Sequence, residues 1–425
     1  MEPRQVFAVD EIDFADREFW TLPLDVREGA FQTLREERPL AFFDEPQLET
    51  DDFLLPRGPG FYVVTKHADI IEISRQPEIF SSAQGATTIL DTGPEMAEFF
   101  GSMINLDDPR HARLRRIVSA GFTPKMLKRV EDDVQRAAAR IVDELDADDE
   151  IDFVTAVAAR LPLKIICDMM GIAEQDYDVV FHASNVILSE GDPEYIPEDA
   201  NPLVEVLGAG QQLASLMEEL AKHREAHPTD DLTSALVQAN VDGEKLTHQE
   251  LASFFILLAV AGNETTRNAI AHGLKLLSDH PDQRRIWIDD FEGVAPTAVE
   301  EIVRVASPVM WMRRTTTRPT ELRGMQLPEG SKLLLFYWSA DRDEEVFADP
   351  YRFDVRRDPN PHVGFGGPGP HFCLGAHLAR REITVMLREL FRRYPDIEAV
   401  GQPEQLRSSF INGIKHLRAS VGRAA

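Results

Sequence analysis

The chain has 425 residues, 43% of them hydrophobic, which is enough to bury a large core. Its formal charge of −28 argues against nucleic-acid binding and against docking on anionic membranes, since both need a basic surface. Only two cysteines are present, which excludes a disulfide framework and a four-cysteine metal site. We therefore expect a reducing, cytoplasmic compartment.

The first hundred residues mix both kinds of secondary structure. FYVVT at Phe61 favours a short strand, and HADIIEISRQ after it favours a helix. The pattern from Asp108 to Leu390 is mostly helical and opens with Asp108 as an N-cap candidate and Pro109 at the first helical position. The acidic stretch DADDEID, which follows the next helix, is typical of a solvated turn.

Cys167 lies on the apolar face of a predicted helix, where a buried, inert thiol is expected. The region from Gln175 to Ala226 reads as two helices around a proline-bearing connection, either a surface loop or a lid. The longest helical pattern follows, with a capping box at Thr247 and Glu250. Because it is apolar almost all round as far as Ala261, it should run through the middle of the protein.

FFILLAVAG, the most apolar run, is about half of the roughly 20 residues that a membrane span needs. PTAVEEIVRVASP is a further helix, LLLFYWSA indicates strand, and a last helix begins at Leu374. The fold class is therefore mainly α with a small β portion and no membrane span. No repeat or linker divides the chain, so we expect one domain over residues 1–425 with an irregular segment at 1–30.

One of the two cysteines lies in the stretch FGGPGPHFCLGAHLARREI, residues 365–383. Its glycines and prolines exclude a helix and indicate a tight loop whose backbone lies close to another group. Cys373 should then lie at a helix N-terminus, where unpaired amides and the helix dipole stabilise a thiolate. A nucleophile, a redox switch, a metal ligand and a plain structural cap all remain open on this stretch alone.

Four motifs in order resemble those of the cytochrome P450 family, over residues 30 to 420. The cysteine stretch resembles the family's ligand signature, although Gly366 stands at the usual phenylalanine position and Phe365 lies one residue earlier. AGNETT from Ala261 resembles the oxygen-activation motif. EEIVR and HARLR resemble the family's Glu-x-x-Arg and His-x-x-x-Arg arrangements. The signature positions in register are Gly367, Gly369, His371, Cys373 and Gly375.

The resemblance implies a single-domain fold, a triangular prism with haem b between a long central helix and the helix after the cysteine loop. It implies that Cys373 is the iron ligand, that Thr265 and Glu264 help dioxygen accept protons, and that Glu301 and Arg304 form a buried structural pair. The remaining cofactor-binding residues that it implies are His111, Arg115, Arg314, His371, Ala261, Phe365, Gly366 and Gly375. Arg314 is chosen over Arg313 by its spacing to TEL.

The implied reaction inserts one oxygen atom of O2 into an unactivated C–H bond. Because the chain has no flavin or iron–sulfur segment, its electrons would come from a ferredoxin and a ferredoxin reductase. We expect a monomer, and a basic docking face for the acidic donor. That face would comprise Arg110, Arg113, Arg115, Arg116, Lys125, Lys128, Arg129, Arg380 and Arg381.

Several stretches look most like the bacterial branch that omega-hydroxylates methyl-branched lipids or hydroxylates sterol side chains. A branched fatty acid or isoprenoid is the expected substrate, with a cholesterol or cholestenone side chain as the alternative. A peroxide-using or isomerising haem enzyme and a non-catalytic haem sensor or carrier would leave Glu264 and Thr265 unexplained. Expected substrate contacts are Phe100, Met103, Ile104, Phe254, Leu257, Val260, Val309, Trp311, Phe410 and Ile411.

Overall fold

The chain divides into two compact units, one built on a sheet and one mainly helical. The computed structural model describes residues 2–45, 58–122, 124–147, 149–240 and 243–423, without the side chains of residues 124, 125 and 127. A sheet unit comprises Met1–Ala112, Val309–Phe353 and Pro359–Leu374. A helical unit comprises Arg113–Pro308, Asp354–Asp358 and Gly375–Ala425. The expectation of one domain over residues 1–425 stays a prediction.

The sheet unit is built on a five-stranded sheet of order β1-β2-β8-β5-β3, in which only β2 and β8 are parallel. Its strands are β1 (Leu40–Phe43), β2 (Phe61–Val64), β3 (Phe80–Ser81), β5 (Trp311–Thr316) and β8 (Lys332–Phe336), with a hairpin of β6 (Thr320–Leu322) and β7 (Met325–Leu327). Its helices are α1 (Leu24–Glu37), α2 (His67–Ser74), α3 (Pro94–Gly101) and α13 (Tyr337–Ala340). Helix α1 thus begins inside the segment expected to be irregular.

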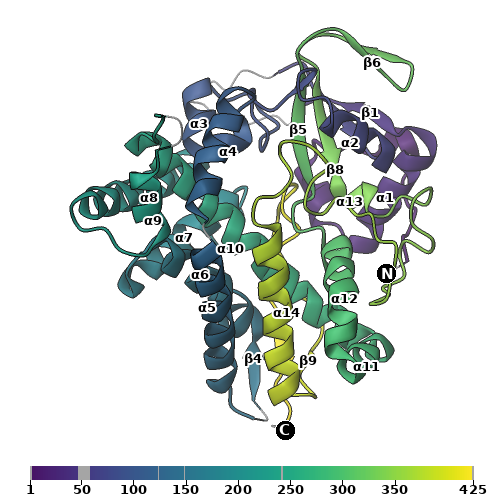
Figure 1. The fold of residues 1–425 in the computed structure, drawn as a ribbon. Helices are drawn as coiled ribbons and strands as arrows, with labels where there is room; N and C mark the ends of the chain where they lie inside the picture. Colours follow the sequence, from purple (N-terminus) through teal and green to yellow (C-terminus); the bar gives the residue numbers. More distant parts are fainter. Residues whose placement is uncertain (1, 46–57, 123, 148, 241–242, 424–425) are drawn as a thin grey trace. The chain divides into compact units, whose positions relative to one another are not determined.

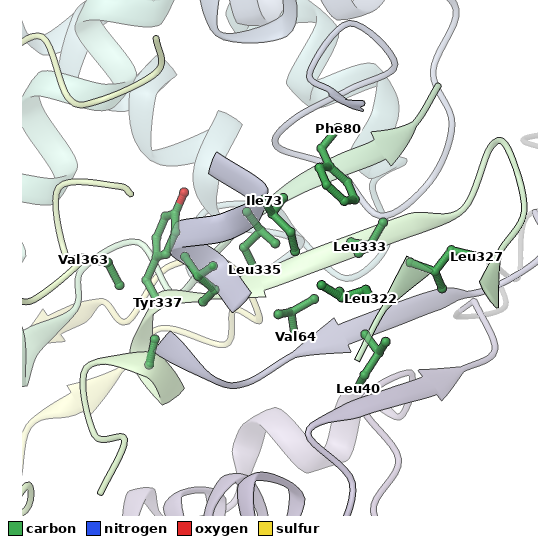
Figure 2. Close-up of a cluster of buried hydrophobic side chains, with 12 residues drawn as sticks. Leu40, Val64, Ile73, Phe80, Leu322, Leu327, Leu333, Leu335, Tyr337 and Val363 are labelled. Carbon is green, nitrogen blue, oxygen red and sulfur yellow. The ribbon is translucent and has the colours of Figure 1, made fainter. Parts of the chain in front are cut away.

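Strand β8 passes through the core of the sheet unit. Every residue from Lys332 to Phe336 is buried, as in a strand covered on both faces. Figure 2 shows Leu333 and Leu335 packed with Ile73 of α2 and Val64 of β2. The strand predicted over LLLFYWSA therefore ends at Phe336, where the chain turns into α13.

The helical unit surrounds α10, which runs from His248 to Asp279 (Figure 1). The predicted capping box is confirmed: Glu250 N donates to Thr247 Oγ1 at 3.1 Å, and Thr247 N donates to Glu250 Oε2 at 2.8 Å. Helices packed on α10 are α6 (Arg160–Met170), α7 (Tyr177–Leu188), α8 (Pro202–Ala226), α11 (Pro281–Asp289), α12 (Phe291–Ala306) and α14 (Ala376–Arg393).

The other helices are α4 (Arg110–Gly121), α5 (Pro124–Asp143) and α9 (Leu232–Gln238). Two short sheets complete the unit, one of β4 (Glu150–Asp152), β12 (Arg418–Ser420) and β9 (Glu398–Ala399), the other of β10 (Glu404–Gln405) and β11 (Ile414–His416). The prediction of a solvated turn is wrong at residues 150–152, because β4 pairs with β12. The sequence of residues 150–152 alone cannot show that they pair with residues 418–420.

Cys167 is fully buried on α6, and burial raises the pKa of its thiol to about 12. A thiol that stays protonated and inaccessible is inert, as predicted. None of the helices in the described ranges combines the length and apolar character of a bilayer span.

Helix α14 carries a buried carboxyl group, that of Glu382. Its side chain is 2% exposed, and its Oε2 atom has no hydrogen-bond partner among the described residues. Burial raises its pKa from 4.5 to about 8. Between these values the unfolded chain has released the proton and the folded chain still holds it, so stability falls as the pH rises.

Glu382→Gln should remove this pH dependence. The slope it removes is up to about 1.4 kcal/mol per pH unit between pH 4.5 and 8. Denaturant unfolding at pH 5 and pH 7.5 measures it, with Glu131→Gln on the exposed face of α5 as control. Equal pH slopes for Glu382→Gln and wild type would contradict the assignment.

Candidate active site

The cysteine loop owes its shape to three glycines with different roles. Gly366 has φ 88°, in the left-handed region that favours glycine. A Cβ on Gly367 would lie 2.3 Å from Oγ of Ser74, and one on Gly369 would lie 2.2 Å from its carbonyl oxygen. The glycine pattern predicted that the loop backbone lies close to another group. For Gly367 and Gly369 that group is Ser74, the last residue of α2.

Cys373 is held in this loop by a backbone hydrogen bond from its N–H to the carbonyl of Phe365, 3.0 Å long. The ring of Phe365 pairs with that of His362, with centroids 5.9 Å apart. Cys373 is part-exposed, between Phe372 and Leu374, which are each 39% exposed. The loop therefore presents an accessible thiol within an apolar surface.

The helix after the cysteine begins later than expected. Gly375 is the N-cap of α14, whose first residue is Ala376 rather than Leu374. Cys373 therefore lies two residues before the N-cap of α14. The helix begins later because Leu374 and Gly375 form a turn. The strong helical pattern of the residues after Gly375 gave no sign of this turn in the sequence.

Three basic residues expected to bind a haem carboxylate lie in the sheet unit. The rings of His111 and His371 lie side by side, with centroids 4.3 Å apart. Arg314 is 6% exposed on β5 and donates to the carbonyl of Arg313 at 2.7 Å. Within the described residues Arg314 forms no ion pair, and burial lowers its pKa although Tyr337 and Asp107 oppose the shift.

Arg313 is used differently. It points to the opposite face of β5, where it pairs with Asp91 at 2.6 Å and donates to the carbonyl of Ile89 at 3.2 Å. The guanidinium group of Arg313 is therefore already paired inside the sheet unit. The choice of Arg314 over Arg313 as a haem-binding residue stays a prediction. Arg115, on α4 in the helical unit, is half-buried.

Helix α10 is buried along most of its length, apart from its two ends and a stretch in its middle. In that stretch Ala261 is exposed, and Leu257, Leu258, Val260, Gly262 and Thr265 are half-buried, whereas the other residues from 251 to 274 are buried. Thr265 Oγ1 donates to the carbonyl of Ala261 at 2.7 Å. An accessible stripe on an apolar helix, ending in one hydroxyl group, is a surface suited to an apolar ligand.

Glu264 is buried inside the helical unit. Its Oε1 accepts hydrogen bonds from Arg267 and from Asn268 Nδ2, the latter at 3.1 Å. Arg267 also donates to Asn185 Oδ1 of α7 at 2.8 Å. Glu264 is 1% exposed, and its Oε2 has no hydrogen-bond partner among the described residues. Oε1 of Glu264 is thus held by two donors, whereas Oε2 can still accept or carry a hydrogen bond.

Glu301 and Arg304 form a fully buried bidentate pair on α12. The contacts Nε–Oε2 and Nη2–Oε1 are both 2.8 Å long. Glu301 also accepts from Arg357 Nε at 3.1 Å and from the backbone N–H of Asp354 at 3.0 Å. Burial alone would raise the pKa of Glu301, but the two guanidinium groups lower it overall. The carboxylate therefore ties residues 354–358 to α12.

Known proteins resemble this chain. The cytochrome P450 family model matches residues 294–412. A methyl-branched lipid omega-hydroxylase of Mycobacterium tuberculosis is 52% identical over 96% of this chain and 94% of its own.

The chain belongs to the cytochrome P450 family. A steroid C26-monooxygenase of Mycolicibacterium smegmatis is 39% identical over 96% of this P450 and 92% of its own length. A Mycobacterium marinum cytochrome P450 in complex with pseudoionone superposes with a TM-score of 0.90 and 42% identity, covering 98% and 100% of the two chains. The predicted family and mainly helical fold are confirmed, and this P450 is a monooxygenase.

The ten residues expected to contact substrate divide by exposure. Phe100, Ile104, Leu257, Val260 and Val309 are half-buried and leave apolar surface accessible. The other five are buried, namely Met103, Phe254, Trp311, Phe410 and Ile411.

The basic residues expected to dock a donor are partly neutralised. Arg113 contacts Glu250 at 2.6 Å, and Glu244 lies 3.2 Å from Arg113 and 3.5 Å from Arg116. Arg110 pairs with Glu98, and Arg380 pairs with Glu300. Lys128 is exposed and Arg129 half-buried, whereas the side chain of Lys125 lies outside the described residues.

Sequence reasoning missed the groups that hold Glu264. Arg267 lies three residues further along α10, a spacing that itself predicts an ion pair. Asn268, at the next position, has no such signal. It bridges Glu264 to the backbone N–H of Ile414, which donates to its Oδ1 at 3.0 Å.

Glu301→Gln should strongly destabilise this P450, because it removes the negative charge that faces two buried guanidinium groups. Losing one partner of a buried pair costs about 3–5 kcal/mol. Glu300→Gln, on the same turn, breaks the more exposed pair with Arg380 and should cost about 1 kcal/mol or less. Denaturant unfolding of both variants checks this, and similar losses would contradict it.

Proposed function

We propose that this P450 is a haem-thiolate monooxygenase that hydroxylates the terminal carbon of methyl-branched lipids. The observation that carries the proposal is the apolar stripe of α10 that ends at Thr265. Relatives named methyl-branched lipid omega-hydroxylase are 52–53% identical, against 38–40% for those named steroid C26-monooxygenase. The higher identity favours the branched lipid, and the sterol side chain is the second candidate.

The donor set of the sheet unit fits a haem b group. Arg314 is a buried cation without an ion pair among the described residues, as expected of a partner for a propionate. His111 and His371 would supply further donors, together with Arg115 of α4. Cys373 would bind the iron as thiolate. A thiolate-ligated haem supplies the oxygen activation needed for insertion into a C–H bond.

Thr265 and Glu264 would handle the protons. The hydroxyl of Thr265 donates to the carbonyl of Ala261, and a χ1 rotation frees Oγ1 to donate toward the accessible stripe. A proton carried by Glu264 would reside on Oε2, because Arg267 and Asn268 occupy Oε1. One carboxylate and one hydroxyl on successive residues suit stepwise proton delivery.

The reaction balances as R–H plus O2, two electrons and two protons, giving R–OH and water. The electrons would come from a ferredoxin and its reductase. Because Glu244 offsets Arg113 and Arg116, the docking charge of the helical unit would rest chiefly on Lys128, Arg129 and Arg381. The remaining expectations, a monomer and a cytoplasmic location, form part of the same proposal.

Phytanic acid, palmitic acid and cholestenone test the substrate class. With ferredoxin, reductase and NADPH, we expect hydroxylation of a terminal methyl of phytanic acid, with kcat/KM about 10-fold or more above that for palmitic acid. A preference for cholestenone would select the sterol candidate. Absence of oxygen consumption with every substrate would instead indicate a haem sensor or carrier.

Thr265→Ala should uncouple the reaction, because it removes the proton donor from the accessible stripe. Product formed per oxygen consumed should fall at least about tenfold, whereas Thr265→Ser keeps the hydroxyl and most of the yield. Oxygen-electrode measurements with product quantification check this. Equal yields for the two variants would exclude a role for the hydroxyl.

A further inference from the structure

Acidic residues of the connection between α7 and α8 bind the turn near the C-terminus. We use "the connection" for residues 189–201 and "the C-terminal turn" for residues 406–413, between β10 and β11. Both segments belong to the helical unit. The C-terminal turn carries Phe410 and Ile411, which are 7% and 0% exposed.

Glu190 accepts several hydrogen bonds from the C-terminal turn. Its Oε2 accepts from Ser408 Oγ at 2.7 Å, from the N–H of Ser409 at 2.5 Å and from the N–H of Phe410 at 3.3 Å. Its own φ is 48°, a left-handed conformation that non-glycine residues seldom adopt without support. The hydrogen bonds to the C-terminal turn supply that support.

Asp192 and Glu194 extend the attachment to the strand that follows. Asp192 is 1% exposed; its Oδ2 accepts from the N–H of Arg407 at 3.0 Å, and its Oδ1 from Lys415 Nζ at 3.1 Å. Glu194 lies 3.1 Å from the same Lys415 Nζ. The connection is therefore fastened at both ends of the C-terminal turn.

His416 joins three segments at this place. Its Nδ1 lies 2.8 Å from Asp152 Oδ2 of β4, and its Nε2 lies 3.1 Å from Glu194 Oε1 of the connection. Glu404 of β10 is its partner across the strand pair. Both ring nitrogens face carboxylates, and only the doubly protonated ring can donate to both.

The other charges around this ring are accounted for. Lys415 is engaged by Asp192 and Glu194, and Arg418 of β12 pairs with Glu150 at 2.6 Å. The hydrogen bond to Asp152 is the main cause that raises the pKa of His416; burial opposes it, and Glu194, Asp152 and Glu404 add to the rise. In this cluster, His416 is the group whose ordinary titration lies near neutrality.

We propose that Glu190, Asp192 and Glu194 latch the connection onto the C-terminal turn, and that protonated His416 is the pH-dependent part of this latch. Because the folded chain holds the proton more tightly than the unfolded chain, the contribution of His416 is complete below about pH 6.5. It is lost as the pH rises through the raised pKa. The connection and the C-terminal turn then loosen together.

The latch also reaches the residues assigned to proton delivery. Ile414, next to Lys415, donates to Asn268, which binds Glu264. Tyr195 of the connection lies within electrostatic range of Arg267 and Glu264. A released latch therefore loosens both the turn that carries Phe410 and the support of Glu264.

Hydrogen–deuterium exchange of the full-length holoenzyme tests the latch without substrate or turnover, so its outcome is independent of the proposed substrate and reaction. Protection of peptides covering 189–201 and 404–416 is compared at pH 6 and pH 9, after correction for the intrinsic exchange rate. We expect protection of both to fall together, by up to tenfold for each unit by which the pKa is raised.

Two variants of His416 separate its charge from its shape. His416→Lys keeps a positive charge at pH 9 and should retain protection there. His416→Gln is neutral throughout and should show low protection at both pH values. Glu190→Ala should loosen both peptides at either pH, because it removes hydrogen bonds that do not involve His416.

His248→Gln is the matched control, since His248 pairs with Glu225 at 2.9 Å outside the latch. It should leave the pH response of both peptides unchanged. The proposal is overturned if His416→Gln keeps the wild-type pH response, or if only one of the two peptides responds.

Discussion

The ion pair between Glu264 and Arg267, inside the helical unit, is the constraint on which much of the site depends. Two buried charges are tolerated only when neighbouring groups satisfy them. Asn185 of α7 accepts from Arg267, Asn268 of α10 donates to Glu264, and Asn268 also accepts from the backbone of β11. The pair therefore links α7 and the C-terminal strand to α10.

The sheet unit also contains one buried charged group that has an ion-pair partner and one that has none among the described residues. Neighbouring residues of β5 point to opposite faces of the strand. Arg313 therefore forms an ion pair with Asp91, whereas Arg314 is buried without an ion pair in the described residues. Holding a buried cation in this way is costly unless an anion joins it. Arg313 thus helps to build the fold, whereas Arg314 is the residue that we propose as a partner of the haem.

Much of this was predictable from the sequence, because the signals are local. Helical periodicity, the capping box at Thr247 and the order of the four motifs depend on residues close together in the chain. The strand at residues 150–152, the late start of α14 and the Ser74 contacts of the cysteine loop depend on distant partners or on turn geometry. The same holds for Asn268 and for His416, whose roles come from contacts that span more than a hundred residues.

The carbon monoxide difference spectrum of the reduced protein tests the central claim, thiolate ligation by Cys373, most directly. Thiolate ligation predicts a strongly red-shifted Soret band in the wild-type protein and its loss in Cys373→Ser, with Cys167→Ser unchanged. A wild-type spectrum without that shift, or a Cys373→Ser spectrum that retains it, would contradict the account.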